Sequence, residues 1–90
     1  MNLFKVLHGI NYDGTVTDID IKNISYDSRK VSKDSLFVAI KGENYDGHNF
    51  INEAVKNGAC AIITNGKSTN NYRIPLIKVK NTRKTMSRLA

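Results

Sequence analysis

Two short apolar runs separated by a helical pattern constrain the fold of this 90-residue chain more than any other feature. Residues 36–40 and 59–64 are mostly apolar and of strand length, a pattern typical of strands that are buried on both faces of a sheet. Between them, apolar residues recur at helical spacing over residues 50–55, and Gly58 suits the position that follows a helix. The chain therefore contains a strand–helix–strand unit, which predicts an α/β fold.

Weaker patterns extend this unit toward both ends of the chain. We expect a short helix, a first strand, a fourth strand and a last helix at residues 3–7, 19–26, 74–79 and 82–90. Either Asn81 or Thr82 can cap the last helix, and Pro75 stands near the start of the fourth strand, where a missing N–H costs little. The resulting order predicts a single small α/β domain, with a mixed β-sheet of about four to five strands flanked by helices.

The composition is that of an ordinary globular domain, because apolar residues make up 40% of the chain and charged residues 24%, enough for one modest core. No apolar run approaches the roughly 20 residues that span a bilayer. The lone Cys60 excludes an internal disulfide, and His8 and His48 lack metal-ligand spacing, so we expect a cytoplasmic protein without a metal site. The pattern of the last helix continues to Ala90 without a residue that suits a helix C-terminus. We therefore expect the chain to be a piece of a longer protein.

Charge is unevenly distributed along the chain. Of the net charge of +6, residues 1–53 contribute −2 and residues 54–90 contribute +8, because every acidic residue lies at or before Glu53. Such a basic half can bind nucleic acid or phosphate, can pack against an acidic surface of a partner, or can be a solvated face. The three Phe and four Tyr form no obvious stacking platform, which disfavours nucleic-acid binding.

Polar loops follow the first two predicted strands and contain the candidate binding residues. Ser28 offers a hydroxyl to a phosphate or ribose oxygen, with Arg29 and Lys30 as nearby cations. The second loop leads into a helix and contributes Gly42, Glu43, Asn44, Tyr45, Asp46, Gly47 and His48. Ligands of open α/β sheets bind beyond the carboxyl ends of strands, and a helix N-terminus favours phosphate, so these loops suit a nucleotide or phospho-sugar. The same residues are typical of structural turns in which Arg29 pairs with an aspartate, and spacing alone does not separate the two interpretations.

Other patterns do not indicate catalysis by this chain alone. The string Asn65-Gly66-Lys67-Ser68 resembles the end of a P-loop, but Ala61 stands where that pattern needs a glycine, and no helical pattern follows. The carboxylate pairs Asp18/Asp20 and Glu43/Asp46 flank loops, and we expect them to be solvated. No nucleophile, base and oxyanion hole come together, so the chain by itself is predicted to be inactive.

From residue 24 to residue 61 the sequence resembles the N-terminal domain of the Mur ligases of peptidoglycan synthesis. The matching motifs are Asp27-Ser28-Arg29-Lys30-Val31, Leu36-Phe37-Val38-Ala39-Ile40-Lys41-Gly42, Asp46-Gly47-His48-Asn49-Phe50-Ile51 and Gly58-Ala59-Cys60-Ala61. The opening residues and the run from Ile24 to Arg29 are more similar to the MurE type, which adds the third stem-peptide residue. The MurF type, which adds D-Ala-D-Ala, is the second candidate.

The resemblance implies that residues 1–90 are the domain that binds the UDP end of UDP-N-acetylmuramoyl-L-Ala-D-Glu. Tyr26 would flank the uracil or ribose, and Ser28 would bond the nucleotide through its hydroxyl. The loop around the uracil would consist of Glu43, Asn44 and Tyr45. Further candidates within the motifs are Arg29, Gly42, Asp46, Gly47 and His48.

The resemblance also implies what this chain does not supply. No cofactor is expected here, whereas the parent enzyme would use ATP and Mg²⁺ in a central domain and would bring the incoming amino acid with a C-terminal domain. The UDP-precursor and these two domains are the expected partners, and neither nucleic acid nor a membrane is expected.

One departure from the family pattern affects a turn. The family usually has Gly-Asp before Leu36, where this chain has Asp34-Ser35. Because aspartate tolerates the left-handed backbone conformation better than most residues, we expect the turn to be preserved. A second departure, the acidic Glu43, would be unfavourable beside a diphosphate unless its carboxylate faces the base.

Overall fold

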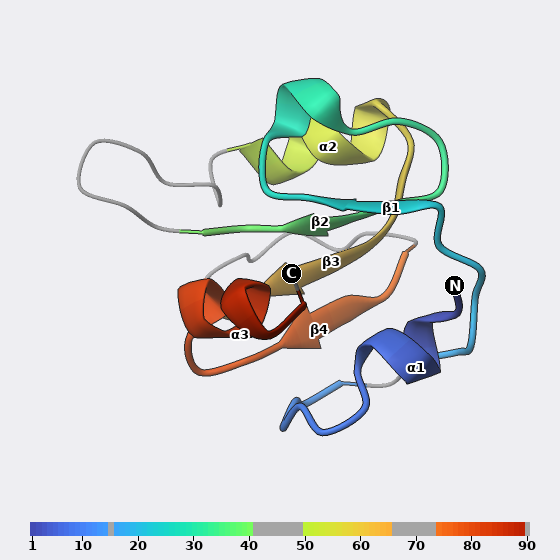
Figure 1. Cartoon of the computed structure of the whole chain (residues 1–90). Coiled ribbons are helices and arrows are strands. Elements are labelled where there is room, and N and C mark those ends of the chain that lie inside the picture. Colours follow the sequence, from blue (N-terminus) through green and yellow to red (C-terminus); the bar gives the residue numbers. More distant parts are fainter. Residues whose placement is uncertain (15, 41–49, 66–73, 90) are drawn as a thin grey trace.

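The computed structural model describes residues 1–14, 16–40, 50–65 and 74–89 (Figure 1). Its helices and strands follow the order expected from the sequence. In chain order they are α1 (Leu3–Val6), β1 (Asn23–Ser25), the 3-10 helix η1 (Ser28–Lys30), β2 (Ser35–Val38), α2 (Ile51–Lys56), β3 (Ala59–Thr64), β4 (Leu76–Lys78) and α3 (Thr82–Leu89). The predicted α/β class is therefore confirmed.

The four strands form one sheet in the order β1-β2-β3-β4, and each neighbouring pair is parallel. The expectation of a mixed sheet is wrong in this respect, since antiparallel pairing in the described ranges is confined to the isolated bridges Asn2–Asp20 and Asp13–Lys78. The reason is that the chain passes through η1 between β1 and β2, and through α2 between β2 and β3. Such crossovers return the chain to the end of the sheet where it started, which makes the strands parallel.

The first strand is shorter than the expected residues 19–26. The N–H of Leu3 donates to the carbonyl of Ile19 at 2.8 Å, and the N–H of Ile21 donates to the carbonyl of Met1 at 2.7 Å. Residues 19–21 therefore pair with the N-terminal segment, and pairing with β2 starts only at Asn23, opposite Ser35. In the sequence, Ile19 and Ile21 alternate with polar residues, but the next apolar residue is Ile24, and this slip in the alternation coincides with the change of partner.

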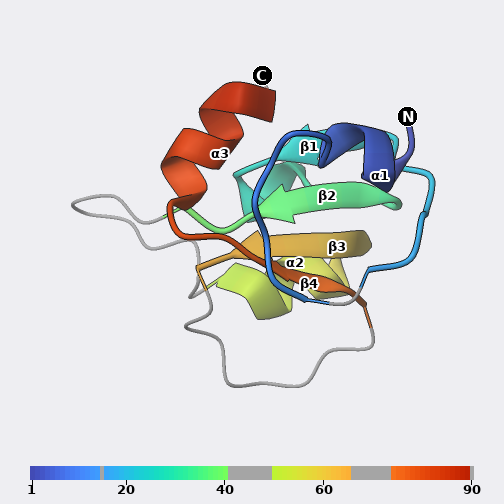
Figure 2. The same ribbon diagram turned by 90° about the horizontal axis from the view of Figure 1, so that it is seen from below.

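The core lies on both faces of the sheet, as the continuous apolar runs predicted. Leu36 and Val38 in β2 face the cluster that also contains Leu3 of α1, whereas Phe37 and Ala39 face the cluster that contains Ile51 of α2. Helices α1 and α3 thus cover one face, and η1 and α2 cover the other (Figures 1 and 2). Burial on both faces explains why β2 is fully buried in the structure.

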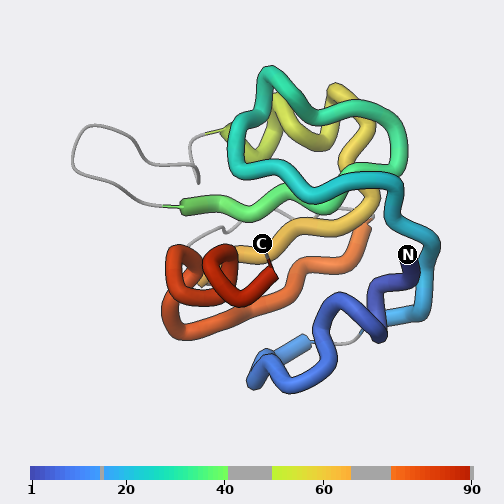
Figure 3. The backbone as a smooth tube through the Cα atoms, in the orientation of Figure 1, coloured from blue at the N-terminus to red at the C-terminus, as the bar shows by residue number. Residues whose placement is uncertain are grey.

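Two predicted turn and cap residues are confirmed. Asp34 adopts a left-handed backbone with φ of 68°, and its N–H donates to the carbonyl of Gly58 at 3.0 Å. Asn81 caps α3, because its Oδ1 accepts from the N–H of Lys84 at 3.0 Å and its carbonyl accepts from the hydroxyl of Thr85 at 2.9 Å. Figure 3 shows the path of the chain at this point: after the end of β4 the tube reverses direction and continues as α3.

Candidate functional site

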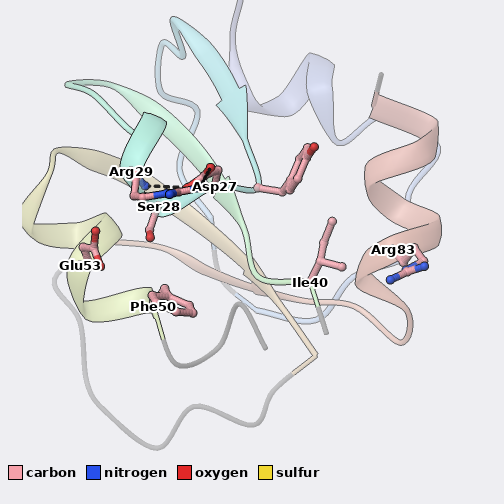
Figure 4. Close-up of a pocket in the computed structure, with 8 residues that line it drawn as sticks. Asp27, Ser28, Arg29, Ile40, Phe50, Glu53 and Arg83 are labelled. Atoms are coloured by element: carbon pink, nitrogen blue, oxygen red, sulfur yellow. Dashed lines mark hydrogen bonds and ion pairs between the residues drawn. The ribbon is translucent and has the colours of Figure 1, made fainter. Parts of the chain in front are cut away.

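A pocket of about 730 Å³ lies where β1 and β2 end (Figure 4). It is within the size range of small-molecule and cofactor sites. Residues from four separate parts of the chain line it: Tyr26, Asp27, Ser28, Arg29, Ile40, Phe50, Glu53 and Arg83. The position at the carboxyl ends of neighbouring parallel strands is the one that the two polar loops predicted.

The first wall is η1, which a local ion pair holds in shape. Asp27 is the N-cap residue, and its Oδ1 accepts from the backbone N–H of Arg29 at 3.0 Å and from Arg29 Nε at 3.1 Å. Arg29 Nη2 donates to Asp27 Oδ2 at 3.0 Å, which completes a bidentate pair. The hydrogen bonds from Arg29 hold the pKa of the Asp27 carboxyl below its ordinary value. Of the two interpretations of Arg29, the structure thus favours the aspartate pair.

Substitution of Asp27 by asparagine is expected to lower the thermal midpoint of unfolding at pH 7 and to have no effect in strong acid. Because the folded-state pKa is lowered, the stabilisation is fully present above the ordinary aspartate pKa of about 3.9. It is lost as the pH falls through the lower folded-state pKa, where the wild-type carboxyl also becomes neutral. Thermal melts from pH 2 to pH 7 measure this difference.

A matched control for this prediction is Asp20→Asn, which makes the same isosteric change at a carboxylate that is 88% exposed and whose ion pair, with the N-terminal amine at 3.5 Å, uses one oxygen only. We expect a smaller difference from wild type for this control. A gap between Asp27→Asn and wild type that is the same at every pH would contradict the role of the carboxylate charge.

Ser28 is the first residue of η1 and combines burial with an available hydroxyl. Only 2% of the residue is exposed, and its carbonyl accepts from Asn57 Nδ2 at 3.0 Å, which ties η1 to the end of α2. The hydroxyl has no hydrogen-bond partner among the described residues, where no fully buried side-chain polar atom is left unsatisfied. The hydroxyl must therefore open into the pocket that Ser28 lines, where it can bond a ligand.

The sequence predicted the near wall of the pocket but not its other sides. Phe50 lies just before α2, Glu53 lies within α2, and Arg83 lies in α3 (Figure 4). The spacing of three residues between Phe50 and Glu53 places them on one side of a helix, a signal that was available in the sequence. No local signal indicated Arg83, because its place depends on how α3 packs after β4.

The other predicted site residues fall into two groups. Tyr26 lies in the pocket wall together with Ser28 and Arg29, and it is 55% exposed. The second group lies outside the described residues and consists of Gly42, Glu43, Asn44, Tyr45, Asp46, Gly47 and His48. The predicted attraction of a helix N-terminus for phosphate is weak here, because α2 has six residues and already carries Glu53 in its first turn.

The P-loop-like string is only partly described, since Gly66, Lys67 and Ser68 lie outside the described residues. Ala61, which stands where a P-loop needs a glycine, is fully buried within β3. No group of three His, Cys, Asp or Glu able to hold a metal occurs in the described ranges, nor is any helix there both long and apolar enough to cross a membrane.

Cys60 is half-buried and donates to the carbonyl of Ser35 at 3.4 Å, and burial raises the pKa of its thiol. A raised pKa disfavours the reactive thiolate.

Comparison with known proteins identifies the family. Residues 20–90 match the family described as "Mur ligase family, catalytic domain". The chain belongs to the Mur ligase family. It is 39% identical over 88 residues to a UDP-N-acetylmuramoyl-L-alanyl-D-glutamate--2,6-diaminopimelate ligase of Oceanobacillus iheyensis, a match covering 98% of this chain and 18% of that protein. It is 43% identical over 93 residues to a ligase of the same name from Clostridioides difficile, covering 100% and 19%.

A solved structure supports the same membership. The MurF ligase from Thermotoga maritima, determined in complex with ADP, superposes with a TM-score of 0.65 at 38% identity. That match covers 76% of this Mur ligase chain and 16% of the other. The chain thus spans less than a fifth of the length of each of these three relatives.

Proposed function

We propose that this Mur ligase chain binds the UDP moiety of UDP-N-acetylmuramoyl-L-Ala-D-Glu, as the N-terminal domain of a MurE-type enzyme. The single observation that carries the proposal concerns the Ser28 hydroxyl. Ser28 is largely buried in η1, yet its hydroxyl opens into the pocket and has no hydrogen-bond partner among the described residues. A nucleotide oxygen would supply that partner. Tyr26 lies in the same wall and would flank the base or ribose.

The choice of the MurE type rests on the relatives. Both sequence relatives named above carry the name of the diaminopimelate-adding ligase, at 39% and 43% identity. The MurF type, which the Thermotoga maritima structure represents, stays the alternative. Family membership favours either type over the nucleic-acid-binding and docking-only interpretations of the basic half.

The remaining steps of the ligase reaction belong, in this proposal, to parts of a longer protein. Ala61 breaks the P-loop pattern in this chain, whereas the Thermotoga maritima relative was determined in complex with ADP. We therefore assign ATP and Mg²⁺ to a central domain and the incoming amino acid to a C-terminal domain, both acting as partners of this one. The enzyme as a whole would be an ATP-dependent amide-bond ligase of the cytoplasm.

Substitution of Ser28 by alanine is expected to weaken binding of UDP-N-acetylmuramic acid without destabilising the fold. Wild type is expected to bind with a Kd of about 0.1–1 mM, or roughly 4–5 kcal/mol. Loss of a hydroxyl that bonds a neutral ribose or base oxygen of the nucleotide would cost about 0.5–1.5 kcal/mol of binding. Stability should be unchanged or slightly higher, because the hydroxyl has no partner among the described residues of the protein. NMR titration of the 90-residue chain measures the affinity, and thermal melts measure the stability.

Ser87→Ala is the matched control, since Ser87 is an exposed residue of α3 that does not line the pocket. UMP and ATP serve as control ligands. Unaltered affinity in Ser28→Ala would remove Ser28 from the site. Equal shifts with ATP and with the uridine ligands would contradict uridine recognition, and a lack of shifts at Tyr26 and Ser28 would contradict binding by this domain.

A further inference from the structure

Arg83 lies across the pocket from η1, on a helix far away in the sequence. Figure 4 shows Arg83 on α3, on the opposite side from Ser28 and Glu53, with Ile40 between them. The Asn81 cap fixes the start of α3 two residues before Arg83. Arg83 is exposed, so its guanidinium can reach a ligand in the pocket.

The two arginines of the pocket differ in their electrostatic state. The charge of Arg29 is compensated by the bidentate pair with Asp27. No ion pair joins Arg83 to a carboxylate in the part of the chain that the structure describes. Arg83 therefore presents an uncompensated positive charge to the pocket. Glu53 gives the opposite side a negative charge, so the pocket is polarised.

The position of Arg83 within α3 supports a role outside the helix. The first turn of a helix favours acidic side chains, and a cation there is unfavourable because the helix dipole is positive at that end. The first turn of α3 has no acidic residue and contains both Arg83 and Lys84. A negatively charged ligand beside this turn would offset that cost.

We propose that Arg83 binds the diphosphate of the nucleotide and makes the pocket prefer nucleoside diphosphates over nucleosides. This inference rests on the proposed function and adds to it a residue and a ligand orientation. The phosphates lie toward Arg83, and the base lies toward Phe50 and Glu53, because Glu53 repels anions. The guanidinium suits a diphosphate, since it offers several N–H donors in one plane.

Comparing Arg83→Gln with Lys84→Gln tests this inference. The two substitutions remove the same charge from neighbouring residues of one helix turn, but only Arg83 lines this pocket, whereas Lys84 lines a second one. Binding of UDP, UMP and uridine to the 90-residue chain is measured by NMR titration at low salt. We expect Arg83→Gln to weaken UDP binding roughly 5- to 10-fold, between the values for exposed ion pairs and for hydrogen bonds to charged groups. Uridine binding should change less than about twofold, and Lys84→Gln should bind UDP nearly as wild type does.

The possible results separate this inference from the proposed function. If wild type binds UDP but Arg83→Gln and Lys84→Gln weaken UDP affinity by the same small factor, Arg83 does not bind the diphosphate and the proposed function stands. If Arg83→Gln weakens uridine and UDP equally, the diphosphate preference is also overturned. If wild type binds none of the three ligands, both proposals fail. Thermal melts of Arg83→Gln should show no loss of stability, which excludes unfolding as the cause of weaker binding.

Discussion

Phe37→Ala is expected to lower the free energy of unfolding by about 3–5 kcal/mol, the usual loss for a buried phenylalanine. Phe37 is fully buried in the middle of β2, and its ring belongs to the cluster under η1 and α2. Truncation removes apolar surface from the core and leaves a cavity that rigid strands on both sides cannot close. A domain of this size has a total stability of roughly 5–13 kcal/mol, so the variant would be marginal. Urea unfolding followed by circular dichroism gives the difference.

Phe4→Ala is the matched control, because Phe4 is the same residue type at a site that is 48% exposed. Its substitution should cost less than about 1 kcal/mol, since surface changes rarely cost more. Phe37→Leu, which keeps most of the volume, should cost less than about 1.5 kcal/mol. Similar losses for Phe37→Ala and Phe4→Ala would show that the α2 face of the sheet is not the tightly packed core described here.

Much of the fold was predictable from local patterns in the sequence. The runs that became β2 and β3 are apolar on both faces, and such runs have few alternatives to a buried strand. Asp34 was expected to preserve a turn in place of glycine, and its φ of 68° confirms this. The near wall of the pocket was also predictable, because Tyr26, Ser28 and Arg29 follow the first strand directly and must lie at its carboxyl end.

Features that depend on packing between distant segments were not predictable. Whether the sheet is mixed or parallel depends on how each connection crosses the sheet, and apolar runs have the same appearance in either case. The early end of the first strand depends on Met1 and Leu3 pairing with residues 19–21. Arg83 reaches the pocket only because α3 returns toward the ends of β1 and β2, and its charge alone did not distinguish it from the other basic residues of the C-terminal half.

Gly58→Ala is expected to lower the free energy of unfolding by about 2–6 kcal/mol, for two separate reasons. Gly58 has a φ of +113°, which side chains rarely adopt, and such strain costs about 1–3 kcal/mol. A Cβ there would also lie 2.8 Å from Lys33 Cα and 2.9 Å from Lys33 N, and overpacking of this kind costs about 1–3 kcal/mol. The atoms in the way are backbone, so no side-chain rotation relieves the contact.

Gly9→Ala separates the two causes of this loss. Gly9 also has a positive φ, of +80°, but a Cβ built there has nothing within 4 Å. This control should therefore show the strain alone, about 1–3 kcal/mol, and the excess for Gly58→Ala measures the clash with Lys33. Equal losses would mean that the backbone at Lys33 moves away at no cost. That movement would itself be visible, because Lys33 leads into Asp34, whose N–H bonds the Gly58 carbonyl at 3.0 Å. The amide signals of Asp34 and of η1 would then shift, and the shift would show that the end of α2 helps to hold the Ser28 wall of the pocket in place.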